Sequence, residues 1–146
     1  MTKRVATRIE KVQAPVIPIV GSLIADHPGT ISLGQGMVHY APPPNAINAT
    51  QKLHEIHHRY GDVQGTPPLR SLLNEKLQSE NQIRTDGCKV VYTAGSNMGF
   101  LNAVLAIADV GDEIIVQSPY YFNYEMAIEI AGCKAVVVAT TSDYQL

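Results

Sequence analysis

KVVYTAGSNMGFLNAVLAIADVGDEIIVQS, residues 89–118, is the stretch that decides the fold. Short apolar runs alternate in it with a longer run of helical spacing, and the alternation continues to residue 140. It predicts strands at 89–95, 112–118 and 134–140, and helices at 97–108 and 121–132. Strands and helices that alternate with short connections are typical of parallel crossovers. The sequence therefore predicts an α/β fold, with a parallel or mixed sheet flanked by helices.

The strands and helix ends of this region carry further signals. The runs EIIV and AVVVA lack polar alternation, which is typical of strands covered on both faces. Gly111 and Gly132 follow the two helical patterns and are interpreted as C-terminal glycine caps. The last residues, TTSDYQL, add no closing element after the third strand. We therefore expect an incomplete sheet in a truncated chain.

The N-terminal half divides into an arm and a helical part. Residues 1–43 are rich in proline and glycine and predict an irregular N-terminal arm, with a short helical pattern and a short strand at 30–35. Residues 44–146 are interpreted as the first part of a larger domain. Pro44 suits the first turn of a helix that runs through LHEIHHRY, and Pro67 opens a second helix with leucines at helical spacing.

Composition and charge argue against several classes of partner. A chain of 146 residues, 45% of them hydrophobic, is long enough for one domain with a core. The formal net charge of −2 and the scattered basic residues give no reason to expect nucleic acid or an anionic membrane as partner. No apolar segment approaches about 18 residues and no signal peptide is recognisable, so we expect no membrane span and a cytoplasmic location.

Cysteines and histidines give no metal signature. Cys88 and Cys133 lie in no metal-binding spacing and are interpreted as two buried thiols in a reducing compartment. His54 and His58 are four residues apart on an expected helix, but no further side chain is placed to complete a coordination shell. We therefore predict no metal site.

The hinge Gly95–Asn97 joins the first expected strand to its helix. Ligands of parallel sheets bind beyond the carboxyl ends of the strands, where helices begin. Gly95 permits a sharp turn, Ser96 and Asn97 offer side-chain donors, and the free N–H groups and the dipole of the helix favour an anion. The hinge thus predicts a phosphate, held without the lysine of a P-loop. The alternative is that Ser96 or Asn97 only caps the helix.

The next junction between a strand and a helix places Pro119, Tyr120, Tyr121 and Phe122 at the end of the second expected strand. Two adjacent strand ends therefore offer a phosphate cup and an aromatic cluster. A planar, phosphorylated heteroaromatic ligand would use both, with one ring stacked on its face. The alternative is that these aromatic side chains belong to the core at the start of the following helix.

An ordered set of motifs resembles the N-terminal part of class I/II aminotransferases, which are fold type I enzymes that depend on pyridoxal 5′-phosphate (PLP). The motifs are ISLGQGMVHYAPPP, YGDVQGTPPLRSLL, VVYTAGSNMGFLNAVLAIADVGDEIIVQSPYYFNY and AGCKAVVV. Each is weak alone, but together they follow the family's order and cover nearly the whole chain from about residue 30. The resemblance implies transfer of an amino group between an amino acid and a 2-oxo acid, by a homodimer.

The same resemblance implies roles for residues of this chain. Gly95–Asn97 matches the family's phosphate cup, with Ser96 and its neighbour Asn97 as donors. Tyr121 matches the aromatic residue that stacks on the pyridine ring. Tyr60 matches a tyrosine that reaches the phosphate of the neighbouring subunit, and Gly36 matches a glycine whose backbone lies near the substrate's α-carboxylate. The arm would help to form the dimer and the mouth of the substrate site.

The resemblance also implies that part of the site is missing. The lysine that forms the Schiff base with PLP, an aspartate for the pyridine nitrogen and an arginine for the substrate carboxylate are all expected beyond residue 146. We therefore expect no catalytic residue in this chain and no transaminase activity from it alone. Three alternatives remain: a PLP-dependent carbon–sulfur lyase of the same fold, a non-catalytic phosphate-ligand binding or dimerisation module, and a different doubly wound enzyme that uses a nucleotide.

Overall fold

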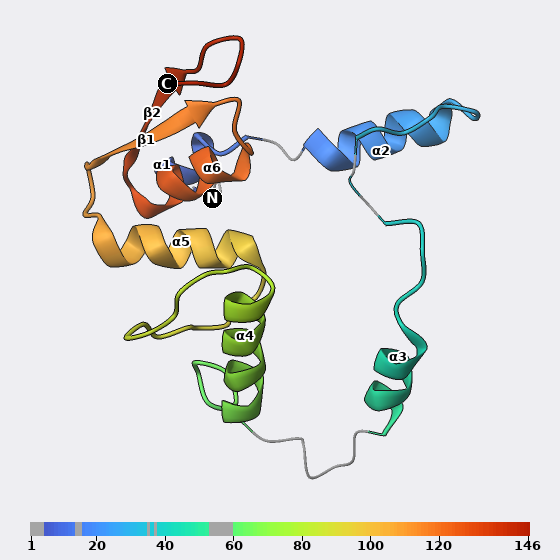
Figure 1. Cartoon of the computed structure of the whole chain (residues 1–146). Helices are drawn as coiled ribbons and strands as arrows, with labels where there is room; N and C mark the ends of the chain where they lie inside the picture. Colours follow the sequence, from blue (N-terminus) through green and yellow to red (C-terminus); the bar gives the residue numbers. More distant parts are fainter. Residues whose placement is uncertain (1–4, 14–15, 35, 37, 53–59) are drawn as a thin grey trace. The chain divides into compact units, whose positions relative to one another are not determined.

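The structure is a computed structural model that describes residues 5–13, 16–34, 36, 38–52 and 60–146 (Figure 1). In chain order its elements are α1 (Thr7–Glu10), α2 (Val16–Asp26), α3 (Pro44–Gln51), α4 (Pro67–Ser79), α5 (Ser96–Ile107), β1 (Glu113–Ser118), α6 (Asn123–Ala131) and β2 (Lys134–Ala139). The chain divides into two units, one of residues 1–19 with 93–146 and one of residues 20–92.

A parallel crossover forms the centre of the first unit. β1 and β2 lie side by side and parallel, with Glu113 opposite Lys134 and Ser118 opposite Ala139. α6 connects the two strands, and it contacts both of them as well as α1 and α5. This arrangement confirms the predicted α/β fold class with flanking helices. It also places the carboxyl end of β1 directly before the aromatic turn that leads into α6.

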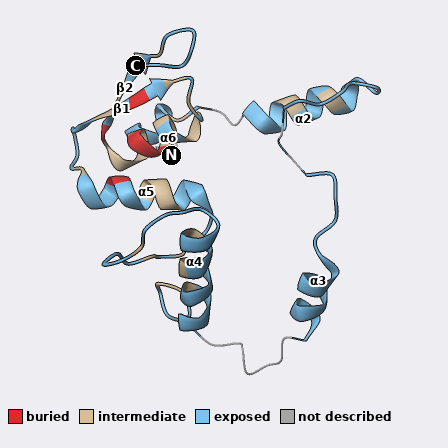
Figure 2. Ribbon diagram, viewed as in Figure 1, coloured by how far each residue is buried: buried red, intermediate tan, exposed pale blue. Residues whose placement is uncertain are grey.

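A small apolar core holds the crossover together (Figure 2). Ile128 of α6 is fully buried and packs with Val104 of α5, Val116 of β1 and Cys133, which precedes β2. Removal of such side chains from water is the main favourable contribution to folding. The core therefore fixes α5, β1 and α6 to one another, and the ends of these three elements carry most of the predicted site.

Only one face of the two strands is covered by described residues, which corrects the prediction of two covered faces. On β1, Val116 is buried whereas the neighbouring Ile115 is 69% exposed. On β2, Val137 is 49% exposed. Successive side chains of a strand point to opposite faces of the sheet, so one apolar face of each strand remains open. The apolar runs thus indicate that both faces of each strand are suited to burial, but the described elements cover only one of the two faces.

Two predicted strands are absent from the described part of the chain. Residues 89–95 form no strand, and the backbone there makes a single cross-contact, from the Tyr92 N–H to the Gln64 carbonyl oxygen at 3.4 Å. Residues 30–34 form no strand either, and Gln35 lies outside the described residues. A strand needs a neighbour to satisfy its backbone N–H and C=O groups. Within the described ranges, no segment offers that pairing to either run.

Most predicted helix ends are confirmed. Pro44 opens α3 and Pro67 opens α4, each at the first turn. Gly132 caps α6 in the left-handed conformation, with φ 82°, as predicted. The predicted cap at Gly111 is wrong, because the cap of α5 is Ala108 with an extended backbone. Gly111, with φ 96°, instead serves the turn that leads into β1.

The N-terminal residues are tied to α6. α2 spans 11 residues, so the short helical pattern expected in this region is a longer helix. In α1, Arg8 donates a hydrogen bond from Nη1 to the carbonyl oxygen of Ile130 at 3.2 Å. Next to it, Lys11 Nζ lies 3.1 Å from Glu129 Oε2. α1 is therefore anchored near the C-terminal end of the helix that supplies the core with Ile128.

Other expectations concern thiols, metals and membranes. Cys133 is buried as predicted, but Cys88 is exposed, which corrects the prediction of two buried thiols.

Among the described residues, no group of three or more histidine, cysteine, aspartate or glutamate side chains could hold a metal ion. His54 and His58, with the helix continuation that carries them, lie outside the described residues. No helix of the described part is long and apolar enough to cross a membrane.

Gly65 provides a test of packing in the second unit. It has φ 95°, and an added Cβ would lie 2.7 Å from Cδ2 of Tyr92. The Tyr92 hydroxyl donates to the Leu69 carbonyl oxygen at 2.8 Å, which restrains the ring. We expect Gly65→Ala to lower the free energy of unfolding by about 2–4 kcal/mol, from the strained φ and the clash together.

The matched control is Gly87→Ala, because Gly87 also has a positive φ of 75° but no atom within 4 Å of the added Cβ. Urea denaturation followed by circular dichroism gives both free energies of unfolding. The excess loss in Gly65→Ala measures the contact with Tyr92. Equal losses in the two variants would contradict the prediction.

Candidate functional site

The start of α5 is an open turn built on Gly95. Gly95 is the N-cap, with φ 81° and ψ 167°, a conformation that L side chains rarely adopt, and nothing lies within 4 Å of where a Cβ would stand. Its N–H bonds the Thr93 carbonyl oxygen at 2.8 Å, and Thr93 Oγ1 donates to the Gly95 carbonyl oxygen at 2.9 Å. These local bonds hold the turn, and they leave space in front of the first helical turn.

Ser96 and Asn97 are both exposed at this turn. In the described part of the chain, neither side chain forms a hydrogen bond with another residue, so neither serves as a helix cap. The backbone N–H groups of a first helical turn have no partner within the helix, and they lie at the positive end of its dipole. The hinge therefore offers backbone and side-chain donors to an anion, and the capping alternative is not what the structure describes.

Tyr120 and Tyr121 have different surroundings. Tyr120 packs against the core cluster and donates its hydroxyl to Oε2 of Glu125 at 2.8 Å. The hydrogen bond to the Glu125 carboxylate, partial burial and the negative charge of that carboxylate raise the pKa of Tyr120 above its usual value. Tyr121 is 42% exposed. The core interpretation thus describes Tyr120, whereas the ring of Tyr121 remains accessible.

The ring of Tyr121 is held by three neighbours that follow it in sequence. Asn123 Nδ2 donates to the Tyr121 hydroxyl oxygen at 2.8 Å. The rings of Phe122 and Tyr124 have centroids 4.9 Å and 5.8 Å away, and the Tyr124 ring meets Tyr121 edge-on at 90°. Sequence reasoning missed Asn123 and Glu125. Their only signal was their place in the first turn of the helix that follows PYYF.

Two hollows lie beside this aromatic turn. The first has a volume of about 600 Å³, and its lining includes Pro119, Tyr121, Tyr124 and Phe100. The second has a volume of about 330 Å³, and its lining includes Asn97, Met98, Asn123 and Met126. The structure thus brings Asn97 of the hinge and Asn123, the partner of Tyr121, to one groove. Ser96 lines neither of these two hollows.

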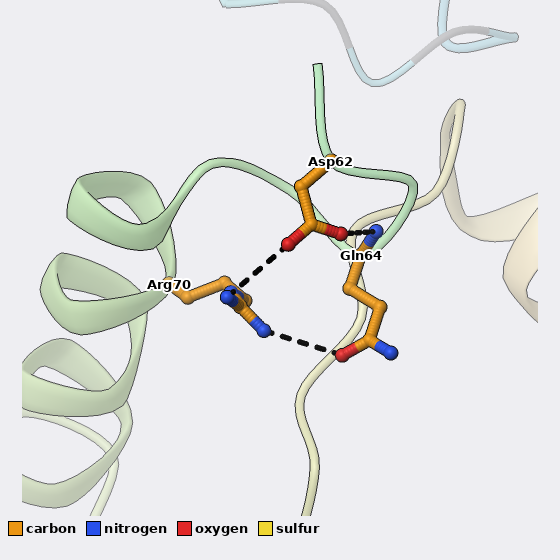
Figure 3. A network of polar contacts seen from close by, with 3 residues as sticks. All are labelled: Asp62, Gln64 and Arg70. Atoms are coloured by element: carbon orange, nitrogen blue, oxygen red, sulfur yellow. Dashed lines mark hydrogen bonds and ion pairs between the residues drawn. The ribbon is translucent and has the colours of Figure 1, made fainter.

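Tyr60 and Gly36 belong to the unit of residues 20–92, where both are exposed. Tyr60 precedes a turn that is fastened to α4 by three side chains (Figure 3). Arg70 donates to Asp62 Oδ2 at 3.3 Å and to Gln64 Oε1 at 3.2 Å, while Asp62 Oδ1 accepts the Gln64 N–H at 3.0 Å. The network gives the turn after Tyr60 a fixed shape, and the roles predicted for Tyr60 and Gly36 remain predictions.

Several of the described lysines are engaged with carboxylates. Lys134 Nζ bonds Glu113 Oε1 at 2.6 Å, where both strands begin, at the opposite end of the sheet from Tyr121. That hydrogen bond and the Glu113 charge raise the pKa of Lys134. Lys11 and Lys76 form ion pairs with Glu129 and Glu80. Lys89 starts no strand, contrary to the strand predicted at 89–95. It lines a polar hollow in the second unit.

A family model described as aminotransferase class I and II matches residues 28–146, and the chain belongs to this family. The sequence is 37% identical over 126 residues to aromatic aminotransferase ISS1 of Arabidopsis thaliana, covering 85% of this chain and 32% of that protein. It is 35% identical over 118 residues to the probable kynurenine–oxoglutarate transaminase BNA3 of Saccharomyces cerevisiae, covering 74% of this chain and 25% of that protein.

Solved structures agree with this assignment. The structure of the aspartate aminotransferase of Rhizobium meliloti matches 99% of this chain with a TM-score of 0.81 at 27% identity, and the match covers 38% of that chain. The chain thus spans between a quarter and two fifths of the length of these relatives. The resemblance inferred from the motifs is confirmed at the level of family and fold.

Proposed function

We propose that this chain supplies the first part of the PLP-binding domain of an aminotransferase that moves an amino group between an amino acid and a 2-oxo acid. The observation that carries the proposal is the glycine-turned start of α5. The side chains of Ser96 and Asn97 are exposed there and bond no other described residue. These donors and the accessible ring of Tyr121 fit a ligand that is both phosphorylated and planar.

The residues would divide the work of binding. When bound, PLP supplies the electron sink on which amino-group chemistry depends. Ser96, Asn97 and the first N–H groups of α5 would bind its phosphate, and the dipole of α5 would favour the two negative charges. Tyr121 would stack on the pyridine ring and exclude water from one of its faces. These groups bind and orient, and none of them has to transfer a proton.

Further parts of the proposal rest on family membership. Tyr60 would reach the phosphate bound by the partner subunit of a homodimer, and the backbone at Gly36 would lie near the substrate carboxylate. Both positions are exposed within their own unit, which supports a role toward a second body. Residues 1–43 would form the arm at the dimer and substrate mouth, and residues 44–146 the first part of the large domain. A cytoplasmic location likewise stays a prediction.

Amino-group transfer is favoured over the alternatives that the sequence left open. The relatives of highest identity quoted above are named as an aminotransferase and a transaminase, which supports transfer over a carbon–sulfur lyase. A nucleotide-binding enzyme would need a glycine-rich fingerprint after a strand, and the hinge is Gly95-Ser96-Asn97. The alternative of a binding module without chemistry predicts no turnover by the complete protein, whereas the proposal predicts amino-group transfer.

The cofactor site is tested with pyridoxine 5′-phosphate, because this analogue has the ring and phosphate of PLP but no aldehyde to react with surface lysines. Titration calorimetry of the 146-residue chain should show saturable one-to-one binding. Inorganic phosphate should compete, and pyridoxine without phosphate should bind at least about tenfold more weakly, since hydrogen bonds to charged groups contribute about 1.5–3 kcal/mol each. Equal affinity for both pyridoxines would refute a phosphate cup.

Catalysis is tested separately with the same polypeptide. In the unit of residues 1–19 and 93–146, the described lysines are Lys11 and Lys134, and both are paired with carboxylates, so we expect PLP, an amino acid and a 2-oxo acid to give no enzymatic transamination above a protein-free control. Product formation is followed by chromatography of the new amino acid. Enantioselective turnover would contradict the expectation that the covalent lysine lies beyond these residues.

A further inference from the structure

The turn from Pro119 to Phe122 must present Tyr121 in one orientation if a flat ligand is to stack on it. The ring is 42% exposed, so packing covers only part of it. A tyrosine with an accessible ring can turn about two side-chain bonds, and a contact that selects one orientation lowers the entropy lost on binding. The neighbours that restrain this side chain therefore bear on the affinity for the ligand.

Asn123 is the polar neighbour that restrains the far end of the ring. Its Nδ2 donates to the Tyr121 hydroxyl oxygen at 2.8 Å, which is the length of a good hydrogen bond. The Tyr124 ring meets the same side chain edge-on, with centroids 5.8 Å apart. The hydrogen bond thus sets the direction of the hydroxyl, while the aromatic contact supports the body of the ring.

The position of Asn123 is itself fixed by the fold. It is the first residue of α6, whose Ala127 and Ile128 are buried in the core. The backbone N–H of Tyr124 bonds the Tyr121 carbonyl oxygen at 2.9 Å, which fastens the turn to the helix. A donor placed on this first helical turn is held by the helix, not by the loop that it restrains.

Asn123 also borders a groove that the hinge borders. It lines the groove of about 330 Å³ together with Asn97 of the predicted phosphate cup. A single residue therefore contacts the predicted stacking ring and borders the same groove as one of the predicted phosphate donors. The side chain of Asn97 has no hydrogen-bond partner among the described residues, so the two side-chain amides are not joined directly.

We propose that Asn123 is a positioning residue that orients the ring of Tyr121 for stacking on a planar, phosphorylated ligand. The inference rests on the proposed function, because it assigns a second residue to the same site. Asn123 acts through the Tyr121 hydroxyl and does not bind the phosphate. Removal of the Asn123 side chain therefore weakens the binding of ligands that carry an aromatic ring and leaves the binding of inorganic phosphate unchanged.

The test is a double-mutant cycle on the 146-residue chain, with pyridoxine 5′-phosphate and inorganic phosphate as probes. Asn123→Ala should lower the affinity for pyridoxine 5′-phosphate about fivefold, which is the effect of one neutral hydrogen bond. The affinity for inorganic phosphate should stay within about twofold of that of the unaltered chain. In the Tyr121→Phe background, the same change should have no further effect, because the hydroxyl that Asn123 holds is gone. Asn102→Ala, an exposed asparagine in the middle of α5, is the matched control.

The outcomes separate the inference from the function on which it rests. Equal weakening of pyridoxine 5′-phosphate by Asn123→Ala with and without the Tyr121 hydroxyl would overturn the positioning role alone. Weakening of both probes would assign Asn123 to the phosphate or to the stability of the turn, and would also overturn it. No saturable binding by the unaltered chain would overturn the proposed function and the inference together.

Discussion

Changing Ser96 and Asn97 together to alanine is expected to weaken the binding of pyridoxine 5′-phosphate about a hundredfold. Both side chains are exposed at the start of α5, and neither bonds another described residue, so both are available to the phosphate. A hydrogen bond to a charged group contributes about 1.5 kcal/mol or more, so two of them account for about two orders of magnitude. The backbone N–H groups and the helix dipole remain and should retain weak binding.

The measurement is titration calorimetry with three ligands: pyridoxine 5′-phosphate, inorganic phosphate and pyridoxine. Both phosphates should lose affinity, whereas pyridoxine should be unaffected because it makes no use of the hinge. The melting temperature should stay within about 2 °C, since exposed side chains without partners contribute little to stability. Asn102→Ala, on the same helix, controls for loss of an amide and should change none of these values. Retained affinity for pyridoxine 5′-phosphate in the double variant would remove the hinge from the site.

Ile128→Ala is expected to lower the free energy of unfolding of the first unit by about 2–5 kcal/mol, the range for truncation of a buried aliphatic side chain. Ile128 is fully buried and packs with Val104, Val116 and Cys133, so its removal leaves an apolar cavity whose lining loses these contacts. The unit has few other buried side chains among the described residues. The loss is therefore a large fraction of the stability that a small unit can have.

Ile128→Val provides a graded variant, expected to cost about 0.5–1.5 kcal/mol, so that the trend is measurable even where alanine prevents folding. Ile107→Ala is the matched control, because Ile107 is 84% exposed at the end of α5 and should change stability by less than about 0.5 kcal/mol. Urea denaturation of all three gives the order Ile128→Ala, Ile128→Val, Ile107→Ala. A loss in Ile107→Ala as large as in Ile128→Ala would contradict the assigned core.

α6 links the stability of the core to the aromatic turn. Its buried side includes Ile128, and its first turn carries Asn123, which bonds Tyr121, and Glu125, which bonds Tyr120. A cavity at Ile128 should therefore also loosen the aromatic turn. The Ser96 and Asn97 changes should leave that turn intact. Comparing the near-ultraviolet circular dichroism of the two sets of variants distinguishes loss of a ligand contact from loss of the scaffold.

The predictions that depended on local pattern agree best with the structure. The helical spacing around Val104 and Ile128, the prolines that open α3 and α4, and the left-handed cap at Gly132 all lie where the sequence placed them. The order of strand, helix and strand at residues 113–139 was also predicted. These features are decided by residues within one or two turns of one another, through periodicity, ring constraint and backbone freedom.

The predictions that failed depended on distant partners. Residues 89–95 have the composition of a strand, but a strand forms only beside another, and the described residues offer none. Ile115 is as apolar as Val116, yet only the second meets the core. Cys88 was expected to be buried on composition alone and is exposed. In each case the missing knowledge was which segments lie next to the residue in space.

By itself, the sequence determined the α/β class, the family, and the short list of residues at the predicted cofactor site, because the order of motifs and the hydrophobic periodicity depend only on the order of residues. Only the tertiary structure decided that Tyr120 packs against the core and bonds Glu125, whereas Tyr121 stays accessible with its hydroxyl bonded by Asn123. Neighbouring tyrosines are equivalent in a sequence. Their surroundings differ only in the folded chain, where Tyr120 is partly buried against the core and Tyr121 stays exposed.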